Sequence, residues 1–73
     1  MSRLIRVFVC DRNGFGVHGQ KVKTYGGETQ YTDSSGLVSF LVESSNISVY
    51  VNGVTAYDGA TSRAEDPIVF RKS

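Results

Sequence analysis

Residues with nucleophilic or basic side chains are scarce in this chain. It contains one cysteine, Cys10, and one histidine, His18. A cysteine or serine hydrolase needs a base beside its nucleophile and a third group that orients the base. Cys10 and His18 are the only such pair in the sequence, and a free cysteine more often packs as a small hydrophobic residue. We therefore expect no catalytic set within one chain.

Metal ligands are equally few. A zinc site needs about four ligands, usually cysteine and histidine, and calcium needs a cluster of oxygen atoms. Asp11 and Asn13 match only the start of a calcium-binding loop, and Asp33 is the one carboxylate in its Asp-Ser-Ser group. Such groups are typical of turns. The sequence predicts no metal site and no cofactor.

Several classes of partner are also disfavoured. Residues 14–19, GFGVHG, match a dinucleotide-binding fingerprint, but that loop requires a following helix and a strand pattern follows here. The formal net charge is +1, from eight basic and seven acidic residues, without the basic stripe of a nucleic-acid-binding domain. No apolar run reaches the roughly 18 residues of a membrane-spanning helix. We expect neither nucleic-acid binding nor membrane insertion.

The first residues, MSRLIRVFVC, lack the uninterrupted apolar stretch and the cleavage site of a signal peptide. We therefore expect a cytoplasmic protein if the chain is complete as given, and an extracytoplasmic one if it is an excised domain.

The elements that position these residues alternate between apolar and polar with a period of two, which is typical of strands. We expect strands over residues 3–10, 17–25, 29–32, 37–42, 47–51, 54–57 and 68–71, and a polar loop over 58–66. Clusters of Gly, Asn, Asp and Ser separate these strands. With 73 residues, the sequence predicts a single small all-β domain.

Alternation within the strands predicts which residues face the core. We expect Val22 to point inward, together with Val38, Phe40, Val42, Ile47, Val49 and Val51. Gly36 and the pair Asn52-Gly53 are expected to take the positive φ of tight turns. Residues 29–32 are expected at an open edge, with Lys21 and Lys23 guarding one edge and Pro67 another. Two copies could pair through such an edge.

Aromatic residues at outward positions favour a binding surface, because they combine apolar area with polar groups. Tyr50 alternates with two inward valines, and Phe15 lies in a loop flanked by glycines. We name Phe15, His18, Tyr50 and Tyr57 as candidate binding residues. The alternative is that strands favour tyrosine whatever their function.

Three segments together carry a family resemblance. Asp11 to Val22, DRNGFGVHGQKV, is followed by YTDSSGLVSF and then by ISVYVNG. This pattern resembles the small Greek-key β-sandwich domains of the carboxypeptidase regulatory-like, transthyretin-like group, and it is similar to the bacterial Ig-like domains of invasin/intimin adhesins. The resemblance covers residues 5–58. It implies an Ig-like or prealbumin-like sandwich of six to seven short antiparallel strands, acting as a spacer, adhesion or accessory module.

Departures from these families bear on activity. Isopeptide-forming relatives carry an asparagine in the last strand, and residues 67–73 contain none. Hydroxyisourate hydrolases of the transthyretin-like group use several histidines, whereas this chain has one. We therefore predict a non-enzymatic module that is structural or binds a protein or carbohydrate partner. The alternative is a small oligomeric enzyme of the transthyretin-like hydrolase type, with a site shared between subunits.

Overall fold

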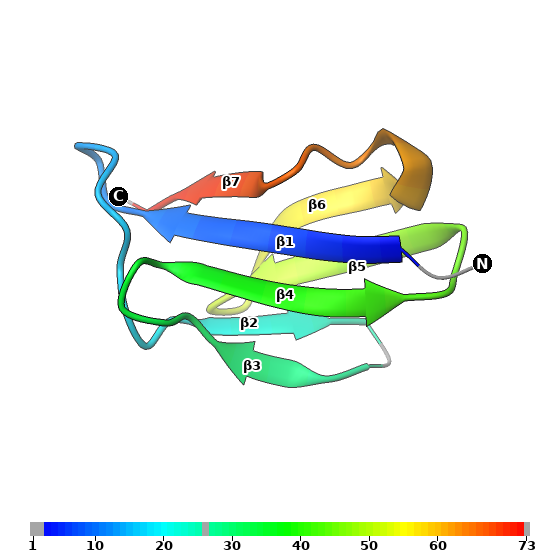
Figure 1. Ribbon diagram of the computed structural model, residues 1–73, viewed down its shortest axis with the longest axis horizontal. Coiled ribbons are helices and arrows are strands. Elements are labelled where there is room, and N and C mark those ends of the chain that lie inside the picture. Colours follow the sequence, from blue (N-terminus) through cyan, green and yellow to red (C-terminus); the bar gives the residue numbers. More distant parts are fainter. Residues whose placement is uncertain (1–2, 26, 73) are drawn as a thin grey trace.

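The computed structural model describes residues 3–25 and 27–72, and within them the chain forms seven strands in two layers (Figure 1). One sheet has three strands in the order β4-β1-β7, and the other has four in the order β3-β2-β5-β6. The strands are β1 (Arg3–Cys10), β2 (Lys21–Thr24), β3 (Thr29–Tyr31), β4 (Leu37–Val42), β5 (Asn46–Val51), β6 (Val54–Ala60) and β7 (Ile68–Arg71). The all-β sandwich expected from the sequence is confirmed.

Two segments differ from the expected strands. The extended stretch over residues 17–25 narrows to β2, because Val17 and Gly19 donate their N–H groups to Val9 and Thr32 outside any ladder. Residues 58–60 are not loop but the end of β6, and a single 3₁₀ turn, η1 (Thr61–Arg63), follows. Asp58 lies opposite Ser48, whose Oγ donates to the Asp58 carboxylate at 2.8 Å. The β5–β6 ladder therefore continues through polar residues, where the polar sequence by itself predicts a loop.

The pairing of β1 corrects the expectation that all strands are antiparallel. β1 runs antiparallel to β4 but parallel to β7, from Val7 opposite Ile68 to Cys10 opposite Arg71. The segment after β6 turns back at the end of the sandwich where β1 begins, so β7 enters its sheet in the direction of β1 (Figure 1). In the other sheet β5 returns to pair with β2 rather than with β4, which is a Greek-key connection.

The core lies between the two sheets and consists largely of valine. Val7, Val9, Val22, Val49 and Val51 have no exposed surface. Ile5, Val38, Phe40, Ile47, Ala64 and Ile68 complete the buried cluster, and Val42 packs against it. β-Branched side chains suit the pleated surface of a sheet, and burying each contributes about 1.5–3 kcal/mol. The inward positions predicted by alternation are confirmed.

The turn before β4 is built on one carboxylate and one glycine. Asp33 Oδ1 accepts hydrogen bonds from the N–H groups of Ser35 and Leu37, at 2.9 and 3.1 Å, and from Ser35 Oγ. Gly36 has a φ of 84°, and a Cβ there would lie 2.5 Å from the carbonyl oxygen of Val9. Gly36 is therefore required both by its conformation and by the close approach of β1.

The edges of the sheets are β4, β7, β3 and β6. The polar strand β3 is an edge as expected, and Pro67 precedes the edge strand β7, where a missing N–H is tolerated. The expectation that Lys21 and Lys23 guard an edge is wrong, because β2 lies between β3 and β5. The two lysines instead lie in the interior of an outer sheet face.

Substitution of Gly36 by alanine tests the close approach to β1. Gly14→Ala is the matched control, because Gly14 has a φ of 89° but a Cβ added there would meet no atom within 4 Å. We expect Gly14→Ala to cost about 1–2 kcal/mol of unfolding free energy and Gly36→Ala about 3 kcal/mol or more, since backbone atoms must also move. Urea denaturation measures both, and equal losses would contradict the close approach.

Candidate binding face

Strand β2 has two chemically distinct sides. Val22 and Thr24 are buried, whereas Lys21 and Lys23 are exposed. Successive side chains of a strand point to opposite faces, so burial of the first pair forces both lysines outward. Both ammonium groups therefore lie on the outer face of the four-stranded sheet.

The neighbouring strands add tyrosines to this face. In the antiparallel register Lys21 lies opposite Tyr31 of β3, and Lys23 lies opposite Tyr50 of β5. Opposed residues of this kind have Cβ atoms about 4.5–5.5 Å apart. Tyr25, directly after β2, is 81% exposed and Tyr31 is 63% exposed. We call the set Lys21, Lys23, Tyr25, Tyr31 and Tyr50 the lysine–tyrosine face.

A groove of about 430 Å³ runs over this face. It is lined by Lys21, Lys23, Tyr25, Tyr50 and Gly53. Gly53 belongs to the tight β5–β6 turn and has a φ of 85°. Because glycine has no side chain, this position leaves the groove open. The volume lies within the range of small-ligand sites in proteins, about 300–1,000 Å³.

The two lysines of this face form no ion pair within residues 3–25 and 27–72. Asp58 is the only carboxylate on β2, β3, β5 and β6, and it accepts a hydrogen bond from Ser48. Among residues 3–25 and 27–72 the one ion pair joins Arg6 Nε to Asp66 Oδ1 at 2.8 Å. That hydrogen bond lowers the pKa of Asp66 below its ordinary value. Neither lysine of the face has an acidic partner in the described chain.

The four residues named from the sequence are not brought together. Tyr50 lies on the outer face, as alternation predicts. Tyr57 lies opposite the buried Val49, packs against the core and donates its hydroxyl to the carbonyl of Ala60. The register between β5 and β6 shifts by one residue between Val49 and Tyr50. Because of this β-bulge, uninterrupted alternation along β6 predicts the wrong face of the sheet for Tyr57.

Phe15 and His18 lie in the loop between β1 and β2. Phe15 is 71% exposed and His18 is exposed. Asp11 Oδ1 holds this loop by accepting the N–H groups of Asn13 and Phe15, at 2.8 and 3.0 Å. Neither Phe15 nor His18 lines the groove. The sequence-based prediction did not include Lys21, Lys23, Tyr25 or Tyr31 in a candidate site, although the alternation of both lysines with Val22 indicates a shared outward face.

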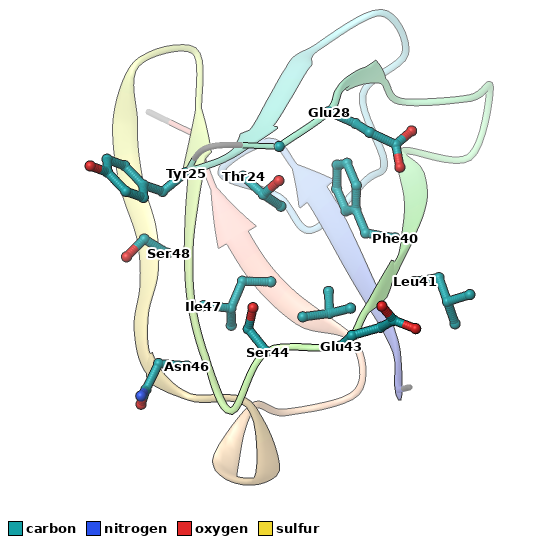
Figure 2. A pocket seen from close by; sticks show the side chains of 12 residues that line it. Thr24, Tyr25, Glu28, Phe40, Leu41, Glu43, Ser44, Asn46, Ile47 and Ser48 are labelled. Atoms are coloured by element: carbon teal, nitrogen blue, oxygen red, sulfur yellow. The ribbon is translucent and has the colours of Figure 1, made fainter. Parts of the chain in front are cut away.

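A second hollow of about 740 Å³ opens beside β4. It lies between the β2–β3 turn, the end of β4 and the start of β5, and Figure 2 shows the side chains around it. Phe40 and Ile47 are buried core residues, and Glu28 and Glu43 contribute exposed carboxylates. No histidine or cysteine lines this hollow. Core residues form the floor of this hollow, and its lining offers no nucleophile–base pair of the cysteine–histidine type.

Catalytic and metal-binding groups do not gather elsewhere in the described residues. Cys10 is only 1% exposed, so its thiol has no path to a substrate. Within residues 3–25 and 27–72, no cluster of three or more His, Cys, Asp or Glu residues is arranged to hold a metal ion. In the same residues, no helix has the length and apolar character needed to cross a membrane.

Comparison with protein-family models, curated proteins and solved structures finds no match for this chain. The lysine–tyrosine face combines a groove, the exposed ring of Tyr25 and two lysines that have no ion-pair partner among residues 3–25 and 27–72.

Acid titration tests the structural role of Asp33. Hydrogen bonds from the Leu37 N–H, then from Ser35 and Gly36, lower the pKa of Asp33. A carboxylate with a lowered folded-state pKa stabilises the fold above its unfolded pKa, and this contribution is lost as pH falls through the folded pKa. We expect Asp33→Asn to be less stable than the wild type near neutral pH.

That stability difference should shrink as pH is lowered from about 7 toward about 2, because the wild type then also loses the charge. Urea denaturation across this range measures the difference directly. A difference that stays constant with pH would contradict the role assigned to the Asp33 carboxylate.

Thiol labelling tests the burial of Cys10. Alkylation requires an accessible thiolate, so we expect native chain to react with N-ethylmaleimide far more slowly than the same chain unfolded in urea. Mass spectrometry over time gives both rates. A native rate equal to that of the unfolded chain would contradict the burial and would favour the enzyme alternative.

Proposed function

We propose that this chain is a non-enzymatic β-sandwich module that binds carbohydrate through the lysine–tyrosine face. The observation that carries the proposal is the groove that Lys21 and Lys23 line together with the exposed Tyr25 and the half-buried Tyr50. Tyrosine offers a large flat apolar surface with a hydroxyl at its tip. A sugar ring, with an apolar C–H face and a polar rim, matches both parts.

The position of the face within its sheet favours side-chain recognition. Both neighbours of β2 are hydrogen-bonded to it, so a polypeptide cannot add there as another strand in the manner of β-augmentation. Protein interfaces also depend on an apolar centre depleted in charge, whereas two lysines occupy the centre of this face. These features favour carbohydrate over a protein partner.

The outer face of the three-stranded sheet has a different character. Leu4 and Leu41 lie opposite each other there and are 55% and 66% exposed. The patch formed by these two leucines offers aliphatic area, so it is the natural negative control for carbohydrate binding.

The strand order is compatible with the family resemblance. The layers β4-β1-β7 and β3-β2-β5-β6, joined by a Greek-key connection, support our proposal that the chain is related to the carboxypeptidase regulatory-like, transthyretin-like and bacterial Ig-like modules. Such modules act as accessory or adhesion domains. The enzyme alternative requires a subunit partner to complete a site around Cys10 or His18, and the buried thiol argues against it.

Retention on immobilised polysaccharides tests the function. We expect the wild-type chain to be retained on at least one member of a panel of neutral and acidic polysaccharides: cellulose, xylan, pectin, polygalacturonate and dextran sulfate. Tyr31→Ala/Tyr50→Ala should weaken that binding about tenfold or more, because truncating an aromatic anchor of a binding surface costs more than about 1 kcal/mol and about 1.4 kcal/mol is a tenfold change. Leu4→Ala/Leu41→Ala, on the opposite sheet, should leave binding unchanged.

Two results would overturn the function: no retention on any polysaccharide, or equal retention of the tyrosine variant and the wild type. Thermal melting of each variant establishes that it is folded before retention is compared.

A further inference from the structure

We propose that the carbohydrate is anionic, a polymer whose sugar rings carry carboxylate or sulfate groups. This inference rests on the proposed carbohydrate-binding function and names the class of ligand. It follows from the arrangement of charge and rings on the lysine–tyrosine face.

The charge on the face is free to bind a ligand anion. Lys21 and Lys23 are exposed, and neither has an ion-pair partner among residues 3–25 and 27–72. The single carboxylate on the four strands, Asp58, accepts a hydrogen bond from Ser48 Oγ at 2.8 Å and forms no ion pair with either lysine. Hydrogen bonds from ammonium to an anionic oxygen are about twice as strong as those between neutral groups. A neutral sugar would leave this capacity unused.

The spacing of the two lysines suits a polymer that lies along β2. They are two residues apart on one side of the strand, which separates their Cα atoms by about 7 Å. Each is paired across the sheet with a tyrosine, Lys21 with Tyr31 and Lys23 with Tyr50. A sugar ring that packs on a tyrosine therefore brings its substituents within reach of an ammonium group.

Nucleic acid fits this surface less well. Its phosphates carry one charge per nucleotide, and affinity grows with the number of phosphates that lysine or arginine neutralises. The face supplies two cations beside three tyrosine rings, and the whole chain has a net charge of only +1. Two cations can neutralise few phosphates, so the face lacks the electrostatic drive on which nucleic-acid binding depends.

Matched polymers test the role of the ligand charge. Polygalacturonate and highly methyl-esterified pectin share a backbone but differ in free carboxylates, and dextran sulfate and dextran form a second pair that differs in sulfate. Affinity electrophoresis of the full chain gives a dissociation constant for each. We expect the anionic member of at least one pair to bind about tenfold more tightly than its neutral partner.

Matched variants test the role of the lysines. Lys21→Gln/Lys23→Gln should lose most of that preference, while Arg63→Gln/Arg71→Gln, which removes the same charge from exposed positions elsewhere, should retain it. Raising the salt concentration from about 20 mM to about 200 mM should weaken binding by the wild type more than by the lysine variant, because exposed charges are screened.

The inference is overturned if the anionic and neutral members of both pairs bind equally, or if the arginine variant loses as much affinity as the lysine variant. Binding that is weakened in the tyrosine variant but is equally tight for anionic and neutral polymers would support the carbohydrate function and reject only this inference. Absence of binding to every polysaccharide would reject both. Tighter binding to single-stranded oligo(dT) than to any polysaccharide would show that the face recognises nucleic acid instead.

Discussion

Burial of Val22 between the two sheets is the constraint on which the rest of the structure depends. Val22 has no exposed surface and lies opposite Val51, which is equally buried. A slip of β2 by one residue would reverse its faces and carry Lys21 and Lys23 into the core, where an unpaired ammonium is strongly unfavourable. The register that builds the core therefore also builds the lysine–tyrosine face.

A single buried hydroxyl fastens the loop that leads into β2. Thr32 is 2% exposed, and its Oγ1 donates to the carbonyl of Val17 while accepting the N–H of Gln20 at 2.9 Å. Gly19 adds a hydrogen bond to the Thr32 carbonyl. A buried polar group must be hydrogen-bonded, so these contacts tie the irregular residues 17–20 to the end of β3. They set where β2 begins, and with it the positions of its lysines.

The same loop is held against β1 through two glycines. A Cβ on Gly16 would lie 1.9 Å from the carbonyl oxygen of Ser35, and one on Gly36 would lie 2.7 Å from the Cα of Gly16. Backbone approaches of this kind admit only glycine. The Asp33 turn that opens β4 and the loop that opens β2 are thus packed on each other at one end of the sandwich.

Local alternation predicts much of this fold but not its long-range choices. The bounds of β1, β4 and β7 follow from short apolar stretches that polar and turn residues delimit. The parallel pairing of β1 with β7 depends on how the chain returns from β6, which no local pattern encodes. β6 continues through Asp58 because a cross-strand hydrogen bond to Ser48 replaces apolar burial, and polarity alone misses this.

Local alternation also predicts part of the candidate site, but long-range strand pairing determines the rest. Tyr50 follows from its alternation with two valines, whereas its pairing with Lys23 requires knowing that β5 lies beside β2. The two lysines of β2 were expected at a sheet edge. Because β2 lies between β3 and β5, they lie at the centre of a sheet face instead. Tyr57 is a candidate binding residue from the sequence, but the bulge in β6 places it against the core.

The most direct test of this account is the register of β2, measured by nuclear Overhauser effects in solution. The account predicts cross-strand contacts between the backbone protons of Lys21 and Tyr31 and between those of Lys23 and Tyr50. Contacts that instead pair Val22 with Tyr31 and Thr24 with Tyr50 would reveal a one-residue slip of β2. That result would remove the lysines from the outer face and contradict the account.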